Sequence, residues 1–349
     1  MARKSKVKKT KEQVQKSSGL KQCDFVFPGE KTSLMGGLIG TAVVFICLAS
    51  VVFFTVKNPA GQPIWYIPLY VLAWPIAAIM LGNWLAAKPR AAQLKKAGRQ
   101  SRVMSNNFSD LYKVLVKQSS LLGMKSPPDM YLVHDDHPVI YSLPGAKGTI
   151  IVSDSLQAAL SPDEFEAVLA HEVAHICCKH VRLDLAQTFI KSANIALKAV
   201  LFPVLLMTFF ARAWDELIEF TADRGALLVT LKPAVVNAAI VKFAVAVDPN
   251  AGIGPAELQA YLDGAGDITT DATQMERHFK VGQFMSSQPG LRERIEQLTE
   301  FVNDAQGKAA MTKMAEQQGV NLGSIVMHRK SEDGVEQMAA DDDEQAIPT

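Results

Sequence analysis

The chain has 349 residues, of which 48% are hydrophobic and only 20% charged, against a charged fraction of about 25% in typical soluble domains. Its net charge of +1 is the near-cancellation of 36 basic and 35 acidic side chains, with eight of the basic ones in residues 1–22 and seven of the acidic ones in residues 331–349. The apolar excess argues against a purely soluble protein, and four cysteines without a framework spacing argue against a disulfide scaffold and indicate a reducing compartment.

Two uncharged apolar runs, residues 34–56 and 64–87, account for most of the excess. Each exceeds the roughly 20 residues that a helix needs to cross a bilayer, and the first is too long for the apolar core of a cleaved signal. Basic residues flank the two runs on their outer sides, while the short connection between them carries a single Lys. The positive-inside rule therefore predicts a transmembrane helical hairpin, with a basic tail over 1–33 and a basic linker over 88–104 in the cytoplasm.

Glycines at 36 and 40 form a GxxxG pattern in the first run. Such a pattern either packs two membrane helices closely or is ordinary glycine content, and for so short a motif both readings stand. The basic tail is an orientation signal that also contacts anionic lipid, in preference to a nucleic-acid site.

A water-soluble domain is expected over residues 105–310, followed by an acidic, disordered tail over 311–349. Residues 106–122 have the pattern of an amphipathic helix, and residues 130–133 and 148–152 that of short strands. Residues 249–271, rich in Gly, Asp and Ala, indicate a loop. We expect an α+β fold, mainly helical, with a small β-sheet.

One helix has a clear start. Ser161 is a good N-cap, Pro162 suits the first helical position, and Glu164 completes the S-x-x-E capping box. The apolar spacing continues this helix to about His180 and places the sequence His171-Glu172-Val173-Ala174-His175 inside it.

This HExxH sequence places two imidazoles on one helix face, because residues four apart are neighbours there. His171 and His175 are therefore candidate ligands of one Zn²⁺ ion, which needs a third protein ligand and an open position for water. Glu172 is the candidate general base for that water. His180, nine residues past His171, is rotated by about 180° and is expected to interact with the helix C-terminus instead.

The third ligand is expected on a second helix, over residues 214–230. Glu219 and Asp223 share a face there at spacing four, so Glu219 is preferred over Asp215 and Glu216, and Asp223 is a candidate partner for the far nitrogen of a ligating His. The apolar stretch 195–211 cannot cross the membrane once, since Glu219 would then lie on the side opposite His171. We expect it to dip into the bilayer surface or to lie beneath the domain.

Two further groups of residues are expected to have ordinary structural roles. The run His134-Asp135-Asp136-His137 follows no metal-ligand spacing rule, so an ordinary loop is favoured over a second metal site. Cys177 lies about 200° round the helix from His175, so either a core or a surface role is favoured for it.

Three segments, GTIIVSDSL, EAVLAHEVAHICCKH and EFTADRGA, together resemble the membrane-anchored gluzincin metallopeptidases typified by the heat-shock protease HtpX and the CAAX prenyl protease. The resemblance covers roughly residues 105–300. It implies a zincin-like fold, zinc ligation by His171, His175 and Glu219, catalysis by Glu172, and orientation by Asp223. It also implies that the strand near 149–152 is the edge on which an extended substrate lies.

The sequence departs from such families at two places. Residues 138–141, Pro-Val-Ile-Tyr, stand where an Asn-Ala-Phe-like stretch is usual, and Gln288 stands where a His is usual before Arg294. Gln288 and Arg294 are the candidate transition-state stabilisers.

We therefore expect a multi-pass inner-membrane zinc endopeptidase with its active site in the cytoplasm. Its expected partners are polypeptide substrates, of membrane or misfolded proteins, and the lipid bilayer, without nucleic acid; a homo-oligomer is compatible with the sequence. The alternative, motivated by Gln288, is a catalytically silent membrane scaffold that keeps zinc for structure.

Overall fold

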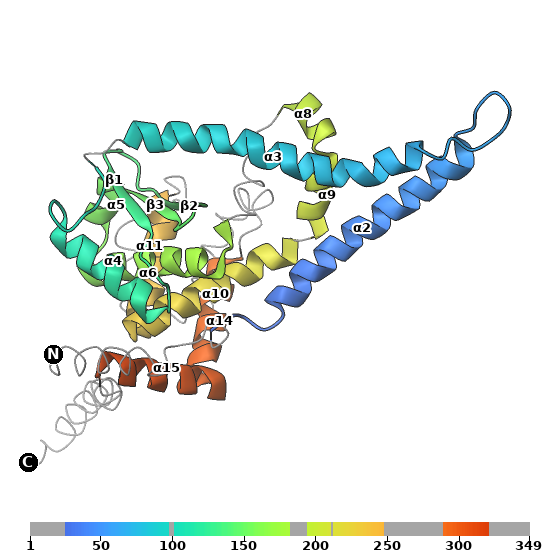
Figure 1. The fold of residues 1–349 in the computed structure, drawn as a ribbon. Helices are drawn as coiled ribbons and strands as arrows, with labels where there is room; N and C mark the ends of the chain where they lie inside the picture. The colour runs from blue at the N-terminus through green and yellow to red at the C-terminus, as the bar shows by residue number, and fades with distance from the viewer. Residues whose placement is uncertain (1–24, 98–100, 182–193, 211, 248–288, 321–349) are drawn as a thin grey trace, which may run out of the picture.

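The computed structural model describes residues 25–97, 101–181, 194–210, 212–247 and 289–320. Two long helices, α2 (Glu30–Thr55) and α3 (Ile67–Ala97), converge toward the loop that joins them and extend beyond a mainly helical body (Figure 1). We call that body, residues 101–181, 212–247 and 289–320, the core domain. It combines helices with one small sheet, as expected for an α+β fold.

The sheet has three strands, β1 (Asp129–Val133), β2 (Ile140–Leu143) and β3 (Thr149–Ser153), in the order β1-β3-β2. β1 runs parallel and β2 antiparallel to β3. β1 and β3 were expected from the sequence, but β2 was not. The expectation that residues 149–152 form the sheet edge is wrong, because β3 is paired on both sides and β2 is an edge strand.

The capped helix α6 (Pro162–Cys178) forms as expected. The Ser161 side chain accepts a hydrogen bond from the Glu164 backbone N–H, and the Glu164 carboxylate accepts one from the Ser161 N–H, so both halves of the capping box are present. The second carboxylate oxygen of Glu164 accepts a hydrogen bond from Lys242 at 2.7 Å, which ties this helix start to α11 (Pro233–Val247).

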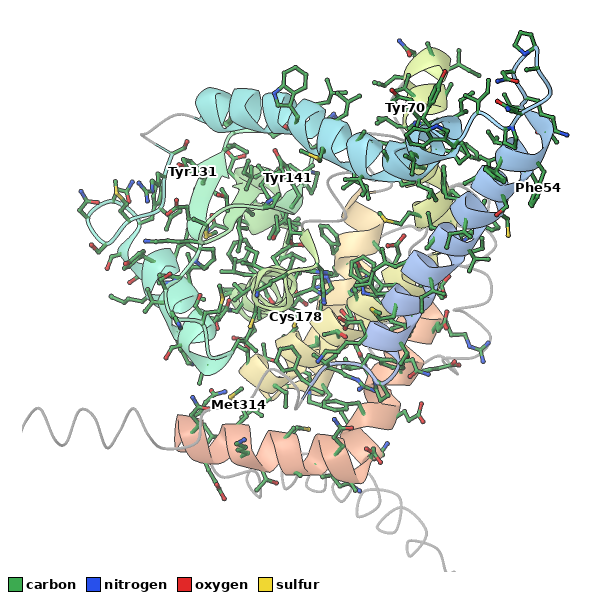
Figure 2. All side chains as sticks on the ribbon, turned by 45° about the vertical axis from the view of Figure 1, so that its right-hand side comes forward. Phe54, Tyr70, Tyr131, Tyr141, Cys178 and Met314 are labelled. Atoms are coloured by element: carbon green, nitrogen blue, oxygen red, sulfur yellow. The ribbon has the colours of Figure 1, made fainter. Side chains whose placement is uncertain are left out.

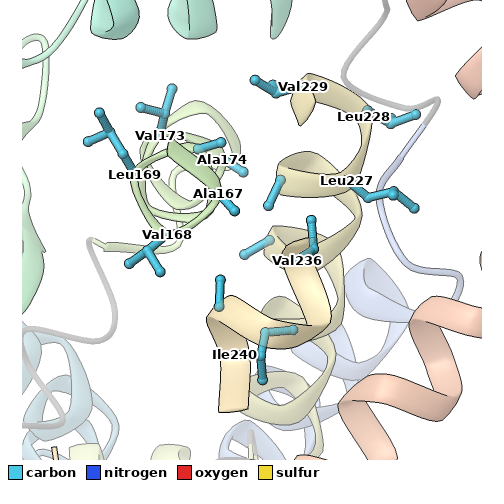
Figure 3. Close-up of a cluster of buried hydrophobic side chains, with 14 of the residues drawn as sticks. Ala167, Val168, Leu169, Val173, Ala174, Leu227, Leu228, Val229, Val236 and Ile240 are labelled. Atoms are coloured by element: carbon cyan, nitrogen blue, oxygen red, sulfur yellow. The ribbon is translucent and has the colours of Figure 1, made fainter. Parts of the chain in front are cut away.

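Helix α10 (Arg212–Thr230) packs along α6 and carries Glu219 and Asp223. Their contact is close at Gly225, where an added Cβ would lie 2.5 Å from the Cβ of Ala174. Figure 3 shows the buried aliphatic side chains that fill the space around α6, α10 and α11. Because Ala174 directly precedes His175, the small residues at this contact set the distance between the two histidines on α6 and Glu219 on α10.

The remaining helices of the core domain lie around α6 and α10. They are α4 (Ser109–Leu121), α5 (Asp154–Ala159), α14 (Leu291–Asn303) and α15 (Ala305–Gln318). Helix α15 continues across the boundary placed at residue 310, so residues 311–318 are helical and pack against the domain through Met314 rather than belonging to a disordered tail. The predicted loop 249–271 and the rest of the acidic tail lie outside the described residues.

The segment just before α2 is part of the core. Phe25 is fully buried in the main hydrophobic cluster, and the Phe27 ring stacks under the guanidinium of Arg224, whose Cζ lies 4.4 Å from the ring centroid. The assignment of residues 1–33 to a tail is therefore wrong at its end: residues 25–29 dock on the domain, and the helix begins at Glu30.

Helix α2 is the one described helix that is both long and apolar enough to span a membrane, by length and composition; the apolar part of α3, Ile67–Gly82, is shorter. The far ends of the two helices expose aromatic side chains such as Phe54 and Tyr70 (Figure 2). Helix α3 also continues through part of the segment assigned to a linker, as far as Ala97.

The described part of the apolar stretch 195–211 forms α8 (Ile195–Val200) and α9 (Phe202–Phe210), and α9 packs against both long helices. Trp74 of α3 donates a hydrogen bond to the Val200 carbonyl at 2.8 Å. Gly40 faces the Phe210 ring, and no atom of the described residues lies within 4 Å of the Cβ position of Gly36, so the GxxxG pair does not bring α2 onto α3.

Candidate metal centre

Three side chains from two helices converge on one point. The Nε2 atoms of His171 and His175 lie 3.0 Å apart, and each lies 3.5 Å from a different carboxylate oxygen of Glu219. Among the described residues, this is the group of His, Cys, Asp and Glu side chains arranged to hold a metal ion. Asp215 and Glu216, the alternatives to Glu219, are not part of it.

The arrangement fits a zinc ion. Two ligands at about 2.0–2.1 Å from zinc in tetrahedral geometry stand roughly 3.3 Å apart, close to the separations found here. The three side chains are 11–15% exposed, so the site is enclosed but reachable. Two imidazole nitrogens and one carboxylate oxygen form the donor set of catalytic zinc sites that keep an open position for water.

The Nδ1 atom of His171, on the side of the ring away from the metal site, contacts the ion pair of Asp223 and Arg294. Asp223 Oδ1 lies 2.9 Å from His171 Nδ1, and Arg294 donates two hydrogen bonds to the Asp223 carboxylate at 2.8 and 2.6 Å. An acceptor on Nδ1 keeps the proton there and leaves Nε2 free to bind metal. Asp223 is thus placed as expected. Two guanidinium nitrogens of Arg294 are directed at Asp223, and the third, Nη1, lies 3.7 Å from Glu219 Oε2, so its role as a transition-state stabiliser stays a prediction.

Burial and charge act in opposite directions on these groups. Burial lowers the pKa of His171, but the hydrogen bonds that its ring donates to the Asp223 and Glu219 carboxylates outweigh burial and raise the pKa to about 9. Burial lowers the pKa of His175 well below its usual value, which keeps this side chain in the neutral form that binds metal. Burial alone would raise the pKa of Asp223, yet the charge of Arg294 holds it below its usual value.

The far nitrogen of His175 contacts a residue that the sequence analysis assigned elsewhere. His180 Nδ1 lies 3.1 Å from His175 Nδ1. His180 does interact with the helix C-terminus, because its N–H donates to the His175 carbonyl at 3.0 Å. Its ring, which the helical rotation had placed away from the zinc face, instead reaches His175, because α6 ends at Cys178 and Lys179 adopts a left-handed conformation, with φ 66°.

The candidate general base contacts the edge strand. Ser142 on β2 donates a hydrogen bond of 2.5 Å to Glu172 Oε2. The sequence analysis missed Ser142, because β2 itself was not expected and a lone Ser in a loop carries no signal.

The other predicted groups lie away from the centre. Gln288 falls outside the described residues. In the loop His134-Asp135-Asp136-His137, His134 pairs with Asp154 and Asp135 accepts a hydrogen bond from the His137 N–H, both of which are local contacts. Cys177 packs against the core, one of the two roles expected for it.

Comparison with known proteins identifies the family. The model of peptidase family M48 matches residues 105–302, which is more than half of the chain. Over 160 residues the chain is 32% identical to the plastoglobule-localized metallopeptidase 48, chloroplastic, of Arabidopsis thaliana; the match covers 43% of this chain and 44% of that relative, so it spans less than half of the relative's length. No solved structure matches the chain. The chain therefore belongs to peptidase family M48, as its resemblance to the HtpX and CAAX prenyl protease kind implied.

Proposed function

We propose that the protein is a membrane-bound, zinc-dependent endopeptidase acting on membrane or misfolded polypeptides. The observation that carries the proposal is the convergence of His171, His175 and Glu219 beside the carboxylate of Glu172. A structural zinc site is closed by four protein ligands, whereas this one offers three and a neighbouring base.

When bound, zinc supplies a Lewis acid that polarises the scissile carbonyl and lowers the pKa of a water molecule at the site. Glu172 accepts the proton of the attacking water and then delivers it to the leaving amine. Ser142 donates a hydrogen bond to the Oε2 oxygen of this carboxylate, which orients Glu172.

An extended substrate would lie along β2. No described residue forms a backbone hydrogen bond with the outer edge of this strand, while Ser142 on the same strand contacts the base. Strand addition at such an edge binds the main chain of a peptide with little dependence on its sequence, which suits an endopeptidase of unfolded segments.

The anchor would place this site next to the membrane. Helix α2 is about 39 Å long at 1.5 Å per residue, enough for a hydrocarbon core of about 30 Å, and its outward side chains are apolar. We propose that α2 and α3 form the transmembrane hairpin, that α8 and α9 fill the space between them, and that basic flanks keep the core domain on the cytoplasmic face.

Replacing Ser142 by Ala should lower kcat by about 10- to 150-fold, because a hydrogen bond to a charged group contributes about 1.5–3 kcal/mol. Zinc affinity should stay unchanged, since Ser142 does not contact the ligands. Steady-state kinetics on a fluorogenic peptide measure this, with Ser119→Ala, a buried hydroxyl on α4, as the control. An unchanged kcat in Ser142→Ala would contradict the orienting role.

The function is tested by casein cleavage with the detergent-solubilised chain. We expect cleavage that a chelator abolishes and added zinc restores. A chain that binds zinc stoichiometrically without cleaving casein or a fluorogenic peptide would instead be the silent scaffold.

A further inference from the structure

A chain of buried hydrogen bonds joins the ligand His175 to the first residue of the anchor helix α2. His180 Nδ1 lies 3.1 Å from His175 Nδ1, and His180 Nε2 lies 3.1 Å from Glu30 Oε1. Thr221 of α10 donates to the other Glu30 oxygen at 2.5 Å, and the Phe27 N–H donates to the Thr221 hydroxyl at 3.0 Å. Every side chain in this chain of contacts except Phe27 is buried.

Once Nε2 of His175 binds metal, the donor and acceptor of each hydrogen bond are fixed. The ring proton of His175 is then on Nδ1 and must be donated to Nδ1 of His180. The ring proton of His180 is therefore on Nε2 and is donated to Glu30. The carboxylate accepts from His180 on one oxygen and from Thr221 on the other, and it needs no further donor. Each donor therefore meets an acceptor, as is found for the carboxylate–histidine pairs behind zinc ligands.

Local packing fixes the position of His180, which lies between His175 and Glu30 in these hydrogen bonds. The left-handed Lys179 lets the His180 N–H bond to the His175 carbonyl at 3.0 Å, which places the His180 ring beneath the ligand. The His180 ring then meets the indole of Trp214 edge-on, at 6.0 Å between centroids. Trp214 in turn packs with Ile218 and with Leu34 of α2, so the first turns of the anchor helix are docked on α10.

We infer that Glu30 and His180 are positioning residues of the metal centre, holding His175 in the tautomer and orientation that bind zinc. This inference rests on the proposed function. His171 receives the equivalent support from Asp223, which lies inside the core domain, whereas the support of His175 comes from the anchor. The metal centre is therefore completed by Glu30 of this helix, and zinc affinity depends on the hydrogen bonds that join Glu30 to His175 through His180.

The test measures zinc affinity of the full chain in detergent by competition with a chromogenic chelator. Glu30→Ala should weaken zinc binding by about 10- to 100-fold, the usual effect of removing a group that orients a ligand. Glu30→Gln keeps an acceptor for His180 and should recover most of the affinity. The visible absorption of the cobalt-substituted protein should change in Glu30→Ala, because it reports the geometry of the ligands.

Leu34→Ala is the matched control, since it loosens the same helix docking without touching the hydrogen-bond chain. It should lower the melting temperature and leave zinc affinity and the cobalt spectrum as in the wild type. If Glu30→Ala does not fold, Thr221→Val removes one donor to Glu30 and should shift the same two readouts in the same direction. Wild-type zinc affinity in Glu30→Ala would overturn the inference, while a wild type that binds no zinc would overturn the proposed function instead.

Discussion

Replacing Glu172 by Gln should lower kcat for peptide cleavage by about 10²- to 10⁴-fold, the range that a positioned general base contributes. The amide keeps the size of the carboxylate and can still contact Ser142, but it cannot accept the proton of water. His171, His175 and Glu219 are untouched, so the variant should bind one zinc with the affinity of the wild type. Steady-state kinetics and metal analysis on the same preparation measure both quantities.

Glu166→Gln is the control for this substitution, because it changes the same chemical group on the same helix, outside the metal centre. It should retain full activity. If Glu172→Gln cleaves at the wild-type rate with zinc bound, Glu172 is not the base. If Glu172→Gln loses its zinc, the inactivity reports a damaged site and the assigned role is likewise wrong.

Replacing Arg294 by Met should lower the free energy of unfolding by about 3–5 kcal/mol, the cost of removing one partner of a buried ion pair. Asp223, with a side chain 2% exposed, would lose both donated hydrogen bonds, and Glu219 would lose the positive charge 3.7 Å away. Denaturant titration followed by tryptophan fluorescence measures the loss. It should be smaller with zinc than with chelator, since the bound cation compensates part of the missing charge.

Arg292→Met on the same helix is the matched control. Arg292 pairs with Glu296 at 2.7 Å, but both side chains are solvent-exposed to a third or more, and such pairs contribute about 0.2–1 kcal/mol. Equal losses in the two variants would contradict the account of Arg294 as the residue that holds Asp223 and His171 in place.

Local signals made much of the metal centre predictable. Ser161, Pro162 and Glu164 mark a helix start within four residues, and the i, i+4 rule then places His171 and His175 on one face. The pair Glu219 and Asp223 follows the same rule on α10. Such features are read within one or two helical turns, so no knowledge of distant packing is needed.

The features that escaped prediction depend on tertiary contacts. Strand β2 has four residues, too few for a visible alternation, and it exists because it pairs with β3. The rotation of about 100° per residue applied to His180 holds only while a helix continues, and α6 ends two residues earlier. Glu30 lies 150 residues from His180 in sequence, directly before an apolar run, so its contact with the metal centre carries no local signal.

The most direct test of the account is a zinc titration of the metal-depleted wild type and of Glu219→Gln, with casein cleavage measured at each point. The account predicts that wild-type activity is absent without zinc, rises in proportion to bound zinc and saturates at one zinc per chain, while Glu219→Gln needs far more zinc and stays nearly inactive. Cleavage by the zinc-free wild type, or a saturation curve that is the same in both proteins, would contradict it.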